Sequence, residues 1–199
     1  TLDEYFDFQK EIIELCVSKL SPKGSICWQV GNFVDKGKNG THIIPLDTFL
    51  FPIFKKHNLF LRNRIVWHYR HGQNNKHRFS GRYETINWYT KTGDYIFNLD
   101  NVRIPQLYPG KRNYKGSKVG KYSSNPLGKN PGDIWDIPNV KSSHIEKTGH
   151  PCQFPIAVVE RLIKCLSNKG DIVFDPFLGS GTTAAAALIN GRRAAGAEI

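Results

Sequence analysis

The stretch from Asp171 to Thr183 constrains the fold of this chain more than any other, because it joins a strand, a glycine turn and a helix. It reads Asp-Ile-Val-Phe-Asp-Pro-Phe-Leu-Gly-Ser-Gly-Thr-Thr. The apolar residues 172–174 predict a buried strand that ends at Asp175, and the Gly-Ser-Gly turn opens a helix of alanines. Glycines at such a turn let the backbone approach a ligand, and a helix N-terminus offers unpaired N–H groups to an anion. The stretch therefore predicts a strand–turn–helix unit of an α/β sheet, with a ligand at the carboxyl end of the strand.

A second acid, at the end of the next predicted strand, indicates a nucleoside ligand. Glu198 follows Asp175 by 23 residues, a spacing at which a carboxylate accepts the hydroxyls of a ribose. The turn from Gly179 to Ala184 fits the dinucleotide fingerprint G-x-G-x-x-G/A, so this pattern alone leaves NAD open. Asp175 would repel a pyrophosphate, however, whereas it suits a cofactor that carries an ammonium beside a carboxylate. S-adenosylmethionine has both groups, so the turn favours that cofactor over NAD and over a turn whose glycines only ease packing.

A phosphate-binding P-loop is excluded because Gly181 is not followed by Lys.

The composition indicates which class of partner the chain binds. The 28 Lys and Arg against 17 Asp and Glu give a net charge of +11, which favours polyanionic partners. The 199 residues suffice for one domain with a buried core. No apolar run approaches the roughly 18 residues of a membrane span. The absence of Met favours a segment of a longer protein.

The cysteines predict neither a zinc site nor a disulfide framework, because they are scattered and form no C-x-x-C pair. A reducing cytosol is therefore expected. The four residues are Cys16, Cys27, Cys152 and Cys165.

The amino-terminal half predicts alternating helices and strands. Residues 1–4 have the form of a capping box and start a helix that runs to about residue 20. The elements expected next are a strand at 25–30, a loop at 35–41, a helix capped by Asp47, and strands at 59–69, 84–90 and 95–98.

Residues 99–149 change character, being rich in Gly, Pro, Ser and Lys, and they predict an irregular lobe. Pro155 is expected as the first residue of the next helix, and a strand, a helix and a strand finish the chain. The alternation of helices and strands predicts a parallel α/β sheet that the lobe interrupts.

The order of three motifs resembles the β class of DNA amino-methyltransferases of restriction–modification systems. His150-Pro-Cys-Gln-Phe-Pro155 comes first, then the Asp175 turn, then Gly196-Ala-Glu198. The family usually has Thr and Lys where this chain has Cys152 and Phe154. Upstream, three more stretches are similar to that family, so the resemblance covers essentially the whole chain. They are Asn63 to Trp67, Arg78 to Trp88, and Gly132 to Pro138.

This resemblance implies a Rossmann-like sheet of an S-adenosylmethionine-dependent methyltransferase, with circularly permuted motif order and an inserted target-recognition lobe. It implies one continuous catalytic domain, in which 1–98 form the catalytic half, 99–147 the lobe and 148–199 the cofactor half. Asp175 is expected to bind the methionine ammonium, and Glu198 the ribose hydroxyls. The cofactor-binding residues that the resemblance implies are His150, Gln153, Phe154, Asp175, Phe177, Gly179, Ser180, Gly181, Thr182 and Glu198.

The family's catalytic motif, Asp/Ser/Asn-Pro-Pro followed by an aromatic residue, has no counterpart here, because the chain contains no Pro-Pro. In the β class this motif lies upstream of the opening helix, so it is expected before Thr1. Asn125-Pro126 and Asn130-Pro131 lack the second proline and are expected as ordinary turn formers. No residue is therefore predicted to be catalytic, and the segment alone is predicted to be inactive.

Two long stretches without an acid, 48–83 and 101–132, predict contacts with double-stranded DNA. The bland alternative is a solvated basic face. The DNA-binding residues predicted from these stretches are Arg78, Arg82, Arg103, Lys111, Arg112, Lys115, Lys118 and Lys121. No metal site is predicted, because His68, His71 and His77 have no acid or thiol partner nearby in sequence.

The reaction that the resemblance implies is methyl transfer to the exocyclic amine of adenine in DNA, with N4 of cytosine as the alternative. An NAD-dependent oxidoreductase and a nonenzymatic DNA-binding module are the remaining alternatives. The resemblance also implies a bacterial or archaeal cytoplasm close to the nucleoid. A homodimer and a cognate restriction endonuclease are the protein partners that it allows, and no membrane partner is expected.

Overall fold

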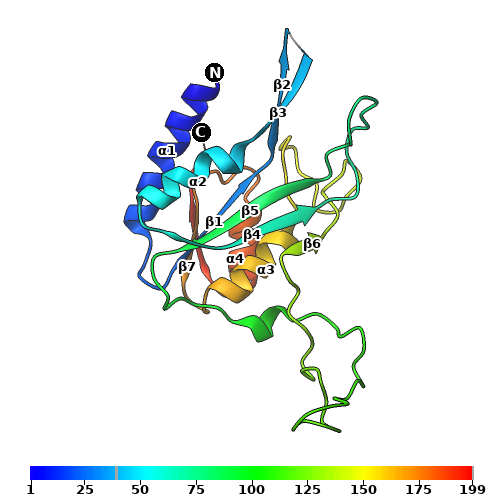
Figure 1. The fold of residues 1–199 in the computed structure, drawn as a ribbon. Coiled ribbons are helices and arrows are strands. Elements are labelled where there is room, and N and C mark those ends of the chain that lie inside the picture. Colours follow the sequence, from blue (N-terminus) through cyan, green and yellow to red (C-terminus); the bar gives the residue numbers. More distant parts are fainter. Residues whose placement is uncertain (39, 199) are drawn as a thin grey trace.

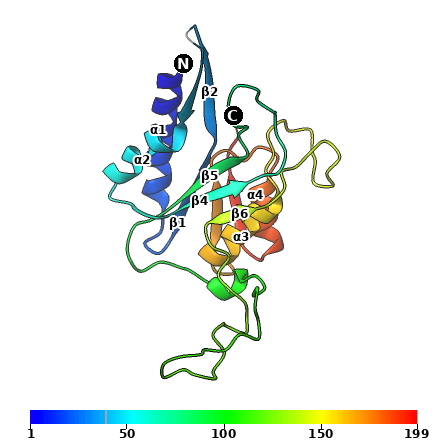
Figure 2. The ribbon, with the colours of Figure 1, turned by 45° about the vertical axis from the view of Figure 1, so that its right-hand side comes forward.

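The computed structural model describes residues 1–38 and 40–198, and its centre is a four-stranded sheet between two layers of helices (Figure 1). Helices α1 and α2 cover one face of this sheet, and α3 and α4 lie on the other side (Figure 2). In spatial order the strands are β1 (Ser25–Val30), β5 (Tyr83–Thr90), β4 (Phe60–His68) and β6 (Ile134–Asp136). The helices are α1 (Leu2–Lys19), α2 (Leu46–Lys56), α3 (Ile156–Leu166) and α4 (Thr182–Ile189).

The α/β class is confirmed, but the expectation of a parallel sheet is wrong for β1, β4 and β5. Strand β5 runs antiparallel to both β1 and β4, and only β4 and β6 are parallel. The reason is the connection between β4 and β5: residues 69–82 form a loop without a helix, and such a return brings the chain back antiparallel. A parallel neighbour would have required a helical crossover.

The last strand–helix–strand unit forms as predicted, but the expected burial of its first strand is wrong, since Ile172 and Phe174 are exposed. Strands β7 (Ile172–Asp175) and β8 (Arg193–Gly196) pair in parallel, and α4 makes the crossover between them. Among the described residues these two strands form a sheet of their own.

The predicted capping box starts α1. The Thr1 hydroxyl accepts from the Glu4 amide at 3.2 Å, and the Glu4 carboxylate accepts from the amino terminus at 2.6 Å. The predicted cap of α2 is wrong, because Pro45 occupies the N-cap position. Asp47 lies in the first turn, where it is buried and accepts from Arg64 Nε, so its carboxylate serves an ion pair between α2 and β4.

Two further predictions of local structure are wrong. The expected loop at 35–41 belongs to a hairpin of β2 (Asn32–Gly37) and β3 (Gly40–Pro45), which projects beyond the sheet (Figure 1); Asn39 lies outside the described residues. The expected strand at 95–98 is irregular, because its aromatic residues pack on Trp88 and the Asn98 amide donates to the Cys165 carbonyl at 2.7 Å.

The lobe is largely irregular, as predicted, but irregular structure throughout 99–149 is wrong for β6, which pairs with β4 in the central sheet. The lobe starts with a short 3₁₀ helix, η1 (Leu99–Val102), and its irregular part ends at β6. An isolated bridge between Ile104 and Lys129 closes its base. The lobe hangs from the end of the sheet opposite to the C-terminus in both ribbon views (Figures 1 and 2).

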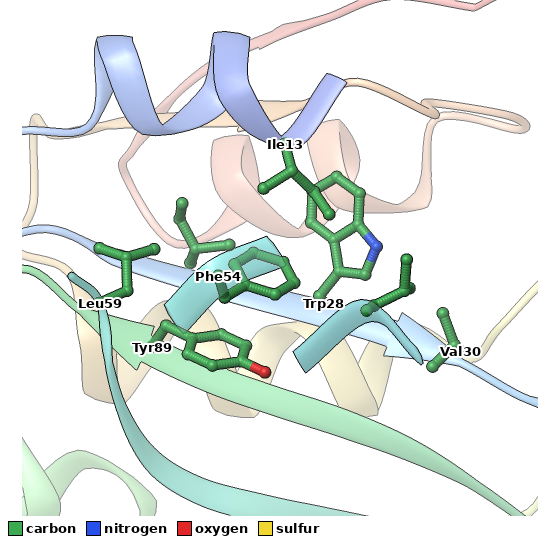
Figure 3. Close-up of a cluster of buried hydrophobic side chains, with 8 residues drawn as sticks. Ile13, Trp28, Val30, Phe54, Leu59 and Tyr89 are labelled. Atoms are coloured by element: carbon green, nitrogen blue, oxygen red, sulfur yellow. The ribbon is translucent and has the colours of Figure 1, made fainter. Parts of the chain in front are cut away.

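Aromatic rings fill the core between α1, α2 and the sheet (Figure 3). Phe54 stacks on Tyr89 with ring centroids 4.2 Å apart, and Trp28 meets Phe54 edge to face at 5.7 Å. The Trp28 indole N–H donates to the buried Gln9 side chain at 3.0 Å, so its polar group is satisfied. Burial of each such ring stabilises the fold by about 1.5–3 kcal/mol, which fixes α1 and α2 against β1 and β5.

Candidate cofactor site

The turn between β7 and α4 has the conformation that its glycines predict. Gly179 and Gly181 have φ of +52° and +82°, in the left-handed region that residues with side chains avoid. One Asp175 oxygen accepts from the Phe177 amide at 3.0 Å, and the other accepts from the Thr183 hydroxyl. The aspartate therefore orders the turn from its own strand end.

The second predicted acid meets the same turn. Glu198 follows β8, and its carboxylate accepts from the Gly179 amide at 2.6 Å. Asp175 stands opposite Gly196 in the parallel pairing, where an added Cβ would lie 2.8 Å from the Asp175 carbonyl oxygen. The close approach at Gly196 brings the two carboxylates to one end of β7 and β8.

The His150 imidazole packs against the turn from a distant part of the sequence. An added Cβ on Gly179 would lie 3.2 Å from His150 Cε1 and 3.3 Å from Nε2. His150 Nδ1 lies 2.8 Å from the Cys152 carbonyl oxygen, to which it donates. In the neutral ring Nε2 is then an acceptor. The structure thus brings His150, Asp175, Gly179 and Glu198 together.

Two other predicted cofactor residues have contacts within the protein. Gln153 Oε1 accepts from the Thr148 backbone N–H at 3.0 Å, and Gln153 Nε2 donates to the Glu146 carbonyl at 2.7 Å. The Gln153 side chain therefore shapes the turn before His150. Phe154 packs against two buried clusters between the sheet, α3 and α4. Their contact with a cofactor stays a prediction.

The remaining predicted residues of the turn lie at the start of α4 and beside α1. The hydroxyls of Ser180 and Thr182 are 3.1 Å apart. Phe177 meets Trp28 of β1 and Phe8 of α1 edge to face, with centroids at 5.7 and 6.1 Å. These ring contacts place the carboxyl end of β7 beside the carboxyl-terminal part of β1.

Glu146 is a structural residue that the sequence analysis missed. Its carboxylate accepts from the Ile156 amide at 2.9 Å, at the start of α3. Pro155, which was predicted as the first helical residue, occupies the N-cap instead, and it has no side-chain acceptor to offer. An acid ten residues upstream of a helix leaves no local pattern, so only the folded turn reveals this role.

The predicted DNA-binding residues fall into two groups. Arg78 and Arg82 belong to the loop after β4, on the same side of the sheet as the C-terminus (Figures 1 and 2). The cations of the lobe lie at the other end of the molecule, and they are Arg103, Lys111, Arg112, Lys115, Lys118 and Lys121. The turn between β7 and α4, residues 176–181, is here called the cofactor turn. The structure therefore places only the first group at the end of the molecule that carries this turn.

Both lobe arginines contribute to the lobe itself. Arg103 pairs with Asp100 at 2.6 Å and donates to the Gly128 carbonyl at 3.1 Å. Arg112 lies over the Tyr122 ring, with its guanidinium carbon 4.4 Å from the centroid. The four lysines are exposed. Because these arginines are engaged within the lobe, they are less free to contact the bases of DNA.

A polar cluster of three residues that the sequence analysis missed joins β6 to the end of β4 and the residues that follow it. Asp136 lies 2.9 Å from Arg70 Nη2 and 3.2 Å from His68 Nδ1. Arg70, and then His68, hold the pKa of Asp136 below its usual value. Across residues 1–38 and 40–198 no three His, Cys, Asp or Glu side chains gather as metal ligands. Over the same ranges no helix is long and apolar enough to cross a membrane.

A cavity of about 220 Å³ lies away from the cofactor turn, between the base of the lobe, β4, β5 and α3. Its lining includes Trp88, Trp135 and Arg161, and the Arg161 guanidinium carbon lies 4.8 Å from the centroid of the Trp135 ring. The cofactor site predicted at the two carboxylates and the glycine turn is therefore separate from this cavity.

Comparison with known proteins gives the family directly. The family model N6_N4_Mtase, described as DNA methylase, matches residues 1–199. Type II methyltransferase M.BglII from Bacillus subtilis is 50% identical over 198 residues, which are 100% of this chain and 54% of that relative. The DNA adenine methyltransferase YhdJ from Escherichia coli K12 is 33% identical over 99% of this chain and 63% of that relative.

Solved structures agree on the fold. The PvuII DNA methyltransferase, described as cytosine-N4-specific, superposes with a TM-score of 0.75 at 21% identity, over 99% of this chain and 67% of that chain. TTHA0409 from Thermus thermophilus, a putative DNA modification methylase solved with S-adenosyl-L-methionine, gives 0.70 at 24% identity, over 99% and 72%. At these identities the likeness concerns the fold alone.

The fold is the one found in these two solved structures. By its sequence the chain belongs to the DNA methylase family. It spans about half the length of the M.BglII relative. The predicted family is confirmed, and the NAD-dependent oxidoreductase is excluded.

Proposed function

We propose that the protein containing this chain transfers a methyl group from S-adenosylmethionine to the exocyclic amine of a base in double-stranded DNA. One observation supports it most: His150, Asp175 and Glu198, far apart in sequence, meet around Gly179. They do so in a chain that matches the DNA methylase family along its whole length.

The chemistry of this cradle fits the cofactor. Asp175 would hold the methionine ammonium and Glu198 the ribose hydroxyls, because carboxylates accept from both groups. In the part of the chain that the structure describes, nothing lies within 4 Å of an added Cβ at Gly181, so a ligand can approach the backbone closely there. Glu198 already accepts from the Gly179 amide, so that amide orients its carboxylate. When bound, the cofactor supplies an electrophilic methyl group on a sulfonium.

The chain's own contribution is to bind and orient. The target base must leave the stack before its amine can be reached. The amine nitrogen then has to be held in line, and its electrons, delocalised into the ring, have to be localised by acceptors on the amino protons. Residues 1–199 contain no Pro-Pro-aromatic motif for that task. We assign to this chain the cofactor orientation, which lowers the barrier through proximity.

Adenine stays the prediction for the target base. It is supported by the relative YhdJ, which is named as a DNA adenine methyltransferase. Cytosine N4 is the second candidate, because the PvuII enzyme is described as cytosine-N4-specific. Nucleoside analysis distinguishes the two by the modified base that appears.

The experiment uses the full-length protein, labelled S-adenosylmethionine and unmethylated genomic DNA. We expect label in DNA, and N6-methyladenine in the hydrolysate. N4-methylcytosine would correct the base while upholding the reaction. DNA that stays unlabelled, while the protein still binds DNA, would leave the nonenzymatic DNA-binding module as the function.

The setting follows from the relatives. Several are named type II methyltransferases, which favours a restriction–modification system with a cognate endonuclease. Their bacterial sources favour a cytoplasmic place beside the nucleoid. A homodimer stays a prediction, which sedimentation of the full-length protein checks.

A further inference from the structure

A loop outside the cofactor turn presents an aromatic ring entirely to solvent. Residues 71–82, here called the 71–82 loop, connect β4 to β5. Phe79 near its end is 100% exposed. An exposed phenylalanine ring is unfavourable in water, and a fully exposed ring contributes no packing to the fold, so it is available to a partner.

The loop that carries this ring is braced from inside. Arg82 Nη1 donates to the carbonyl oxygens of Gln73 at 2.9 Å and Gly81 at 2.8 Å, and Nη2 donates to Asn74 Oδ1 at 2.7 Å. The Asn75 amide donates to the Ser80 hydroxyl at 3.0 Å across the loop. A braced loop can hold a ring at a fixed place, and it loses less entropy on binding than an unordered one.

Gly72 belongs to the same bracing. An added Cβ at this position would lie 3.1 Å from Arg82 Nη1, so the absence of a side chain lets the guanidinium reach its carbonyl partners. Arg82, predicted from the sequence as a DNA contact, is therefore a positioning residue of the loop in this structure.

The charge around the ring selects the kind of partner. Lys76, His77 and Arg78 immediately precede Phe79, and the chain has no acid between Asp47 and Glu84. Arg78 Nη1 donates to the Phe79 carbonyl at 3.2 Å, which places this cation beside the Phe79 backbone. A ring flanked by cations matches a nucleic acid, whose bases stack on aromatics while its phosphates pair with Lys and Arg.

The 71–82 loop also lies at the same end of the sheet as the cofactor turn, where a flipped base would have to meet the methyl group. Gln29 near the end of β1 donates to Glu84 at the start of β5 at 2.7 Å, directly after the loop. Trp28, the neighbour of Gln29, contacts Phe177 of the cofactor turn. The 71–82 loop and the cofactor turn are thus connected through the carboxyl end of β1.

We propose that Phe79 is a wedge that enters the DNA stack beside the target base and stacks on the bases that the flipped nucleotide leaves behind. Lys76 and Arg78 hold the flanking phosphates. Apolar side chains that enter a base step unstack it, and the stacking they restore offsets the cost of drawing a base out. This inference rests on the proposed function, because it needs a DNA base as the target.

The test compares the full-length protein with Phe79→Ala, Phe79→Trp and the control Phe60→Ala. Phe60 is also an exposed phenylalanine, but it starts β4, at the opposite end of that strand from the 71–82 loop. Single-turnover methylation is measured on a duplex with the protein's own site, paired normally or with the target base mispaired. A mispaired base leaves the stack at lower cost, so it needs the wedge less.

We expect Phe79→Ala to methylate the paired duplex about tenfold more slowly, since one base–aromatic stack of about 1.4 kcal/mol corresponds to that factor. Mispairing restores its rate to within about twofold of the parent's, and Phe79→Trp keeps the parent's rate on both duplexes. Phe60→Ala behaves as the parent throughout.

Three outcomes would overturn the wedge. They are a parent-like rate for Phe79→Ala on the paired duplex, an equal loss on both duplexes, and a changed oligomeric state in sedimentation, which would make Phe79 a contact between copies of the chain. A parent that methylates no DNA would refute the proposed function instead, and that result differs from all three.

Discussion

Asp175 and Glu198 are the residues on which the cofactor assignment depends, since each carboxylate meets the same glycine turn from a different strand. Both already accept from donors of the turn, so their orientation is set before a ligand arrives. We expect Asp175→Ala and Glu198→Ala each to weaken binding of S-adenosylhomocysteine by at least about 1 kcal/mol, the scale of a hydrogen bond to a charged group. Calorimetry on the full-length protein measures this.

The matched control is Asp94→Ala, which removes an exposed acid that pairs with Lys23 at 2.9 Å on the surface. Its affinity should equal the parent's. If both Asp175→Ala and Glu198→Ala also kept the parent's affinity with the fold intact, the assignment of the two carboxylates would be refuted.

Gly179 offers a second prediction at the residue scale. Its φ of +52° and the His150 ring 3.2 Å from an added Cβ both oppose a side chain. Gly179→Ala should lower the free energy of unfolding by about 1–2 kcal/mol and weaken cofactor binding. Gly110→Ala is the control, because nothing lies within 4 Å of its added Cβ. Equal unfolding midpoints for the two variants in urea would contradict the prediction.

At the scale of elements, α3 depends on an acid from a preceding loop. Glu146→Ala removes the acceptor of the Ile156 amide, and we expect a loss of about 1 kcal/mol in the free energy of unfolding, as for other lost helix caps. Glu11→Ala, in the exposed face of α1, is the control and should change little. A parent-like stability of Glu146→Ala in urea denaturation would contradict this, and would show that another acceptor, such as water, serves the Ile156 amide.

The lobe is the element whose role in DNA binding is still a prediction. Its lysines are exposed single-point donors, and so they suit phosphates. Replacing Lys115, Lys118 and Lys121 by Ala in the full-length protein should reduce the salt slope of DNA binding by about 1 per charge removed. An unchanged slope across several salt concentrations would make the lobe a solvated basic face.

Elements with local signals were predictable, and those that depend on distant partners were not. The β7–α4 turn carries its glycines and acid within nine residues, and the first helix carries its capping box in four, so both followed from the sequence. The antiparallel pairing of β4 and β5 and the ion pair of Asp47 with Arg64 depend on which strands meet. The β2–β3 hairpin was missed because Lys, Gly and Asn dominate its tip.

The candidate site divides in the same way. Asp175, Gly179, Gly181 and Glu198 meet as the motifs predict. The partners of Gln153 and Phe154 could not be foreseen, because a motif fixes residue types but not which groups in the fold surround them. The exposure of Phe79 was equally hidden, since an apolar residue in a sequence suggests burial.

For the molecule as a whole, we propose that cofactor binding and the holding of the target amine are separate tasks. We assign the cradle for S-adenosylmethionine to residues 1–199, which contain no Pro-Pro-aromatic motif to hold the target amine. We therefore expect the segment alone to be inactive and the full-length protein to be active. The activity of the full-length protein should also require the Asp175 carboxylate.

The most direct measurement is transfer of labelled methyl from S-adenosylmethionine to unmethylated DNA, run in parallel with the full-length protein, its Asp175→Ala variant and the segment 1–199. The account predicts label in DNA with the full-length protein, at least about a fivefold slower reaction with Asp175→Ala at limiting cofactor, and none with the segment. Turnover by the segment alone, or none by the full-length protein, would contradict it.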